Sequence, residues 1–157
     1  MPVNVNDLIV ESLQTLRREL NDCGVTIRTS LAPDLPLVSG YKGMLREVIL
    51  NLVQNAIDAM SGVVDRDRLL WVETRRQDAD AIIISIHDTG PGIDQKRMTD
   101  IFDTFVTTKA KGMGLGIAIA RMIVEHHKGQ LTVFSDGRTG ALFRFTLPIP
   151  AVAATSA

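Results

Sequence analysis

The middle of the chain carries the clearest pattern of apolar and polar positions. Apolar residues recur there every three or four positions and predict an amphipathic helix, whose apolar stripe is Leu45, Val48, Ile49, Leu52, Val53, Ala56, Ile57 and Met60. The same spacing places four polar residues on the opposite side: Glu47, Asn51, Asn55 and Asp58. Asparagine is unfavourable in mid-helix, whereas its amide oxygen is a suitable ligand for Mg²⁺. A metal-binding face and an ordinary solvated face both remain open.

Apolar residues in other segments predict strands and two more helices. The predicted strands cover residues 25–31, 69–76, 81–88, 129–135 and 141–147, and the last four form two hairpins. Asn4 or Asn6 could cap a first helix, which is expected to run to Asp22 and to end at Gly24. A third helix is expected over residues 117–125. Three helices against one face of a mixed sheet predict a two-layer α/β sandwich.

The composition is typical of one globular domain. The chain has 157 residues, 45% of them hydrophobic, so we expect a single domain over residues 1–150 and a disordered tail over 151–157. A net charge of −1 provides no electrostatic basis for binding nucleic acid. No signal peptide or apolar stretch of ~20 residues is visible, so no direct membrane contact is expected. The single cysteine, Cys23, suits a reducing compartment, and we expect a cytoplasmic location.

The strand predicted over residues 81–88 ends in a carboxylate. The sequence there reads Asp88-Thr-Gly90-Pro-Gly92. A plain turn would explain this segment, because Asp, Gly and Pro are common in turns. In the functional interpretation, the glycines let the backbone approach a flat base closely, and the carboxylate accepts a hydrogen bond from the amine of adenine. For this segment alone, the plain turn is the preferred explanation.

A second group of glycines, Gly112-Met-Gly114-Leu-Gly116, precedes the helix predicted over residues 117–125. Free backbone N–H groups and the helix dipole make such a helix start favourable for phosphate. A P-loop is excluded because its Gly-Lys-Ser/Thr run is missing, and a dinucleotide fingerprint is excluded because Ile117 stands where its third glycine belongs. The polar segment 95–111 is expected to be a mobile lid that closes over a substrate.

In this order, the motifs resemble the catalytic and ATP-binding domain of bacterial sensor histidine kinases, within the gyrase, heat-shock chaperone, histidine kinase and mismatch-repair ATPase superfamily. The resemblance covers about residues 35–148 and implies the Bergerat ATP-binding fold, with ATP and Mg²⁺ as cofactors. The N box, first glycine box, F box and second glycine box correspond to residues 51–56, 88–92, 101–109 and 112–116. Glu47 and the Thr-Thr-Lys109 lid resemble the subclass that includes nitrogen- and oxygen-responsive kinases.

The resemblance also implies a role for each matched residue. Asn55 and Asn51 would ligate Mg²⁺, and Asp88 would hold adenine. Glu47 would orient or deprotonate the nucleophile, and Lys109 could neutralise the γ-phosphate. The further residues implied in ATP binding are Asp58, Gly90, Gly92, Ile93, Phe102, Thr108, Gly112, Met113, Gly114, Leu115 and Gly116.

The family's phosphoacceptor histidine lies on a separate helical dimerisation domain, and no histidine precedes Glu47 in this sequence. His87, His126 and His127 are expected to be structural or solvated. The resemblance therefore implies a monomeric domain that donates the γ-phosphate of ATP to a histidine of the parent kinase's dimerisation domain, with the receiver domain of a response regulator as the downstream partner. The parent kinase could be membrane-anchored. An anti-sigma-factor-type serine kinase and a nucleotide-binding module without catalysis remain alternatives.

Overall fold

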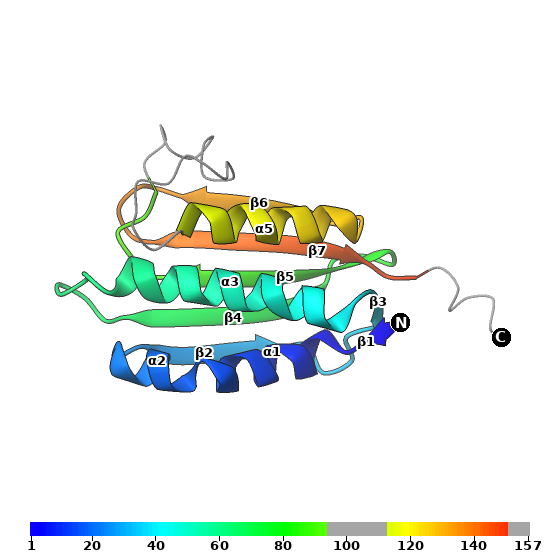
Figure 1. Ribbon diagram of the computed structural model, residues 1–157, viewed down its shortest axis with the longest axis horizontal. Helices are drawn as coiled ribbons and strands as arrows, with labels where there is room; N and C mark the ends of the chain where they lie inside the picture. Colours follow the sequence, from blue (N-terminus) through cyan, green and yellow to red (C-terminus); the bar gives the residue numbers. More distant parts are fainter. Residues whose placement is uncertain (94–112, 151–157) are drawn as a thin grey trace.

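The protein has two layers, with helices on one face of a five-stranded sheet (Figure 1). The computed structural model describes residues 1–93 and 113–150, and describes side chains for 1–93 and 116–150. The helices of this part are α1 (Val5–Thr15), α2 (Arg17–Asp22), α3 (Lys42–Met60) and α5 (Met113–His126). The strands of the sheet are β2 (Thr26–Leu31), β4 (Leu69–Arg76), β5 (Ala81–Asp88), β6 (Gln130–Ser135) and β7 (Ala141–Pro148). The predicted lid and tail lie outside the described residues.

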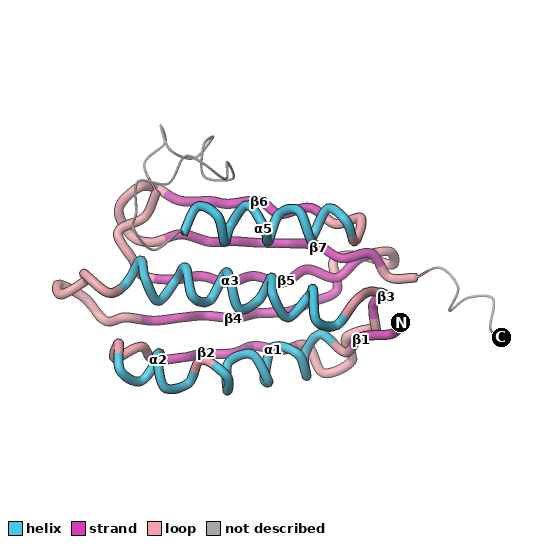
Figure 2. The backbone as a smooth tube through the Cα atoms, in the orientation of Figure 1, coloured by secondary structure: helices cyan, strands magenta, loops and turns pink. Residues whose placement is uncertain are grey.

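The sheet is mixed, as predicted. Its strand order is β2-β4-β5-β7-β6, in which β2 pairs with β4 in parallel and every other pair is antiparallel. Both predicted hairpins are confirmed, and the helices lie on one face of the sheet (Figure 2). The expected α/β sandwich is therefore confirmed. A small sheet of β1 (Pro2–Val3) and β3 (Val38–Ser39) was not predicted, because two residues are too few to show a pattern.

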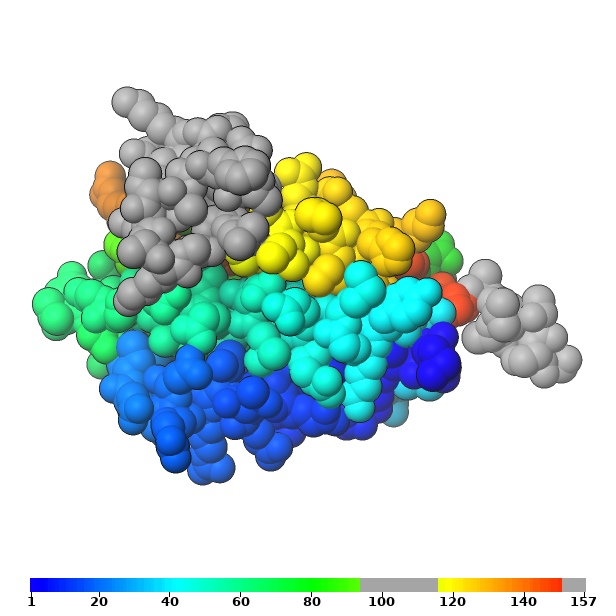
Figure 3. All heavy atoms as spheres, in the orientation of Figure 1, coloured from blue at the N-terminus to red at the C-terminus, as the bar shows by residue number. Residues whose placement is uncertain are grey.

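The hydrophobic core lies between the helix layer and the sheet. All eight residues of the stripe predicted on α3 are buried, with exposed fractions of 6% or less. On the sheet, alternate residues of β7, namely Phe143, Phe145 and Leu147, are buried, whereas Arg144 and Thr146 between them are only half-buried. On the helical face, α3 lies between the N-terminal helices and α5 (Figure 3). None of the helices in the described ranges is long and apolar enough to span a bilayer.

The first predicted helix differs from expectation in two respects. It is divided into α1 and α2 at Leu16, whose φ of −98° and ψ of 10° depart from helical geometry. Of the two candidate caps, Asn4 accepts from the Asp7 N–H at 3.1 Å. Asn6 instead donates to the Ala32 carbonyl at 2.7 Å and accepts from the Thr74 hydroxyl at 2.8 Å. Asn6 therefore joins the helix layer to the sheet.

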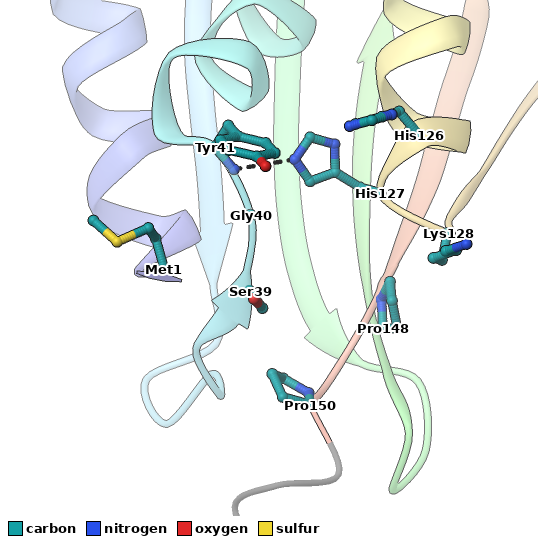
Figure 4. A pocket seen from close by; sticks show the side chains of 9 residues that line it. All are labelled: Met1, Ser39, Gly40, Tyr41, His126, His127, Lys128, Pro148 and Pro150. Atoms are coloured by element: carbon teal, nitrogen blue, oxygen red, sulfur yellow. Dashed lines mark hydrogen bonds between the residues drawn. The ribbon is translucent and has the colours of Figure 1, made fainter.

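His127 connects the C-terminal end of α5 to the N-terminal end of α3 (Figure 4). The buried ring accepts from the backbone N–H of Tyr41 at Nε2, at 3.1 Å. Its Nδ1 lies 2.8 Å from the carbonyl oxygen of Ile123, so Nδ1 carries the proton in this arrangement. The neighbouring His126 is exposed. Of the two possibilities predicted for these histidines, His127 is therefore structural and His126 is solvated.

The two adjacent histidines provide a matched pair of stability variants. His127→Ala should lower the free energy of unfolding by about 1–3 kcal/mol, because it leaves the Tyr41 N–H without its acceptor. His126→Ala should change it by less than about 0.5 kcal/mol, as is usual for an exposed side chain. Urea denaturation measures both values. Similar values for the two variants would contradict a structural role that is specific to His127.

Candidate functional site

Asp88 is a buried carboxylate at the C-terminal end of β5. Only 2% of the residue is exposed, and its Oδ1 accepts from the Gly90 N–H at 2.8 Å. Burial raises the pKa of Asp88 above its ordinary value of 3.8. Hydrogen bonds from the N–H groups of Gly90 and Ala141 and the charge of His87 oppose this rise in pKa. The site therefore holds a carboxylate away from water, with backbone donors to support its charge.

The turn after Asp88 is fixed by contacts on two sides. The Thr89 hydroxyl donates to the Asp67 carbonyl at 2.8 Å and accepts from the Leu69 N–H at 3.0 Å. A Cβ at Gly90 would lie 3.0 Å from the Cβ of Ala59 on α3, so this position is tightly packed. Gly92 has a φ of +89°, and a Cβ there would lie 2.7 Å from the Arg138 nitrogen. Packing within the protein thus requires a glycine at position 92 and favours a small residue at position 90, whatever their effect on a base.

The polar face predicted on α3 becomes more buried from Glu47 to Asn55. Glu47 is exposed, Asn51 is half-buried, and Asn55 is buried with 7% exposed. Asp58 is half-buried and accepts from the Gln54 amide at 3.2 Å. This face of α3 is therefore not the ordinary solvated surface that was one of the two interpretations of the sequence.

Two amide atoms on this face are buried without a hydrogen-bond partner among the described residues. They are Oδ1 of Asn55 and Nδ2 of Asn51, one helical turn apart. Most buried polar groups in proteins are hydrogen-bonded, so adjacent unsatisfied groups make this part of α3 a candidate for contact with a ligand. The Asn55 oxygen fits a cation and the Asn51 nitrogen fits an anion. A rotation of the Asn51 amide by 180° would present its oxygen instead.

Helix α5 begins at Met113, four residues earlier than expected, so Gly114, Leu115 and Gly116 lie in the helix rather than before it. A Cβ at Gly116 would lie 3.7 Å from Oδ1 of Asn51, so the first turn of α5 meets the polar face of α3. The first N–H groups of a helix lack partners within the helix and favour an anion. The predicted glycine and asparagine motifs are therefore adjacent in space.

The predicted site residues that the structure describes lie on α3 from Glu47 to Asp58, on the turn after Asp88 and at the start of α5. Gly90 packs against Ala59, next to Asp58, and Ile93 follows the same turn. Phe102, Thr108, Lys109 and Gly112 lie outside the described residues, and the side chains of Met113 and Leu115 are not described.

Three supporting residues were not predicted to belong to the site. Thr89 fixes the turn after Asp88, and Ser135 accepts from the Ile93 N–H at 2.9 Å. Gly140 has a φ of +125°, and a Cβ there would overlap the carbonyl oxygen of Asp88. Gly140 lies between the strands predicted over residues 129–135 and 141–147, where a hairpin turn is enough to explain a glycine, so its packing role has no separate signal in the sequence.

The comparison with known proteins agrees with this arrangement. Residues 40–151 match the family described as histidine kinase-, DNA gyrase B-, and HSP90-like ATPase. The chain belongs to this family. It is 34% identical over 149 residues to the sensor protein TdiS of Thauera aromatica, covering 94% of the chain. The chain spans only 27% of the length of TdiS.

Solved structures identify the type of domain. The catalytic domain of histidine kinase ThkA superposes with a TM-score of 0.82 at 26% identity, covering 95% of each chain. Full-length ShkA in complex with AMPPNP superposes with a TM-score of 0.83 at 26% identity, covering 96% of this chain and 31% of ShkA. The chain is thus a histidine kinase catalytic ATPase domain, of the kind found in two-component signalling.

The pKa of Asp88 predicts how stability depends on pH. Because the pKa is raised in the folded protein, the folded state binds this proton more tightly than the unfolded chain does. The resulting stability is present below pH 3.8 and is lost as the pH rises through the folded-state pKa. Asp88→Asn should therefore be more stable than the parent protein at pH 7, and the difference should shrink as the pH approaches 3.8.

Asp136 is a control because its pKa is shifted in the opposite direction from that of Asp88. Its exposed carboxylate accepts from the Thr139 hydroxyl and from backbone N–H groups, and these hydrogen bonds lower its pKa to about 2. Its contribution to stability is present above pH 3.8 and is lost as the pH falls through about 2. Asp136→Asn should accordingly be less stable than the parent at pH 7. Chemical denaturation between about pH 2 and pH 7 measures the free energy of unfolding of both variants. If Asp88→Asn were less stable than the parent at pH 7, burial would not be the main cause of the Asp88 pKa shift.

Proposed function

We propose that this chain binds Mg-ATP and donates the γ-phosphate to a histidine on a separate dimerisation domain. The supporting observation is the pair of unsatisfied buried amide atoms on α3, Asn55 Oδ1 and Asn51 Nδ2. They lie on the helix that contacts both the first turn of α5 and the turn after Asp88. A nucleotide with its metal would supply a base to the turn after Asp88, phosphate oxygens to the first turn of α5 and a cation to the amides of α3.

The base would bind at the end of β5. Ionised Asp88 is supported by the N–H groups of Gly90 and Ala141, and its remaining lone pairs could accept from the amino group of adenine. Gly90, Gly92 and Ile93 would line the base. The buried position would make this hydrogen bond stronger than the same bond in water.

The phosphates would bind between α3 and the start of α5. The unsatisfied Asn55 oxygen is the hard, neutral ligand that Mg²⁺ accepts, and Asn51 would contribute a second amide. Bound Mg²⁺ would neutralise phosphate charge. The backbone N–H groups of residues 112–116 would hold phosphate oxygens, and Thr108 and Lys109 remain predicted contacts.

The nucleophile would come from outside this chain. Glu47 is exposed one helical turn before Asn51, so a histidine of another domain could reach it. In the transfer, an imidazole nitrogen forms a bond to the γ-phosphorus while the bond to the β-phosphate oxygen breaks, releasing ADP. Glu47 would accept the imidazole proton. Both ring nitrogens of His127 are engaged within the fold, and His126 lies at the opposite end of α5 from the glycines.

Two relatives support the proposed ligands and partners. ShkA has been crystallised with AMPPNP, and ThkA with the response regulator protein TrrA. By analogy, we propose ATP as the ligand of this chain and a response regulator as the downstream partner of its parent kinase. The isolated domain would act as a monomer in this scheme.

Nucleotide titrations separate the two ends of the proposed site. Asp88→Asn should lose roughly tenfold to hundredfold in ADP affinity, with Mg²⁺ or with excess EDTA, because a charge-assisted hydrogen bond is lost. Asn55→Ala should lose about tenfold with Mg²⁺ and little in EDTA. Calorimetry measures both. Unchanged affinity in Asp88→Asn would contradict the base contact, and an equal loss in EDTA for Asn55→Ala would contradict the metal contact.

Phosphoryl transfer should require a second domain. The chain alone, incubated with labelled ATP, should remain unlabelled, whereas addition of the parent kinase's histidine-bearing domain should give an acid-labile, alkali-stable label on that domain. Glu47→Gln should reduce this transfer and leave ADP affinity unchanged, while Glu125→Gln, an exposed carboxylate near the end of α5, should have no effect. Label on the chain alone would contradict the proposal, and an acid-stable phosphoserine on a partner would favour the serine kinase alternative.

A further inference from the structure

The hydroxyl of Ser135, the last residue of β6, makes three hydrogen bonds. It donates to the Gly140 carbonyl at 2.7 Å and accepts from the N–H groups of Ile93 at 2.9 Å and Gly137 at 3.1 Å. A hydroxyl has one proton to donate and two lone pairs, so its capacity is fully used. Two of these partners belong to the β6–β7 turn, and the third follows the turn after Asp88.

One peptide group connects Ser135 to the carboxylate of Asp88. The carbonyl of Gly140 accepts from Ser135, and the N–H of the same peptide, which belongs to Ala141, is one of the backbone groups that lower the pKa of Asp88. Because a peptide group is planar, the direction of its carbonyl determines the direction of its N–H. The Ser135 hydroxyl therefore influences how the Ala141 N–H is aimed.

The two turns that Ser135 joins are closely packed. Gly140, at a φ of +125°, has no room for a Cβ beside the Asp88 carbonyl. A Cβ at Gly92 would lie 2.9 Å from the Ser135 hydroxyl oxygen. The Asp136 carboxylate accepts from the N–H groups of Arg138 and Thr139 at 2.8 and 2.9 Å, which fixes the β6–β7 turn. Ser135 thus links a hydrogen-bonded hairpin turn to the turn that carries the proposed base contacts.

We propose that Ser135 is a positioning residue for nucleotide binding, which aims the Gly140–Ala141 peptide at Asp88 and holds Ile93 beside it. The nucleotide part of this inference rests on the proposed function, in which Asp88 holds adenine. Ser135 itself does not touch the base. It acts through the orientation of the carboxylate that does.

Loss of the hydroxyl has a measurable effect on Asp88. Without its hydrogen bond to Gly140, the Ala141 N–H supports the charged carboxylate less well, so the pKa of Asp88 should rise further. Other titratable groups occur on the surrounding elements, namely His87 on β5, Asp58 on α3, Asp67 before β4 and Asp136 in the β6–β7 turn. These groups are the same in every variant compared, so a difference between variants reports the effect of Ser135.

Three variants separate the hydroxyl from its surroundings. Ser135→Ala removes the hydroxyl, and Ser135→Thr keeps it. Thr132→Ala is the matched control, because the Thr132 hydroxyl donates to the Arg144 carbonyl at 3.3 Å across the same hairpin, away from Asp88. The first measurement is a carboxyl NMR titration of Asp88 in the nucleotide-free protein. The pKa should rise in Ser135→Ala and should match the parent in Ser135→Thr and Thr132→Ala.

The second measurement is ADP affinity by calorimetry between pH 5 and 8. Ser135→Ala should lose about two- to tenfold, the range expected for one hydrogen bond. The loss should grow as the pH falls, because protonated Asp88 is a weaker acceptor and the variant protonates at higher pH. Thr132→Ala should bind like the parent at every pH.

The outcomes distinguish this inference from the proposed function. An unchanged Asp88 pKa in Ser135→Ala overturns the positioning role, whether or not nucleotide binds. A raised pKa that Ser135→Thr fails to reverse assigns the effect to packing and also overturns it. A parent protein that binds no ADP refutes the proposed function, while the NMR result still tests the link from Ser135 to Asp88. If Ser135→Ala does not fold, Ser135→Cys, which keeps the size of the side chain but donates weakly, replaces it in the same titration.

Discussion

The rotation of α3 about its axis determines both the core and the candidate site. Residues three and four positions apart share a face of a helix, so burying the stripe from Leu45 to Met60 also determines where Asn51 and Asn55 point. A different rotation would expose side chains such as Leu52, which is completely buried. Each such exposure costs about 1.5–3 kcal/mol. Hydrophobic burial therefore holds the two amides in place more firmly than any hydrogen bond of their own.

The groups that suit this site to a ligand also destabilise the folded protein when no ligand is bound. A buried carboxylate at Asp88 loses hydration, and an unsatisfied buried polar group such as Asn55 Oδ1 typically costs about 1–3 kcal/mol. The protein tolerates these costs because they lie at one end of a continuous apolar core. A ligand that supplied the missing partners would remove them. Affinity and the instability of the empty site thus have the same origin.

The sequence predicted those features that depend on a repeating pattern or an unusual residue. The stripe on α3 and the alternation on β7 repeat often enough to be recognised, and mid-helix asparagines stand out because they are poor helix formers. The division at Leu16 and the early start of α5 depend on local geometry that no period reveals. The contact of Ser135 with Ile93 could not be predicted, because the two residues are 42 positions apart and only the register of the sheet brings them together. The packing of Gly140 against the Asp88 carbonyl could not be predicted, because a hairpin turn is enough to explain a glycine at this position.

Helices α3 and α5 are antiparallel and contact each other at two separated points. At one point Gly116 meets Asn51, and at the other His127 accepts from the N–H of Tyr41, which caps α3 ten positions before Asn51. At the rise of a helix, these points are about 15 Å apart. Two helices that contact each other at two separated points resist sliding along each other, so they behave mechanically as a single unit. A force applied at the exposed ring of Tyr41 would consequently move Asn51 and Gly116 together and preserve the spacing between them.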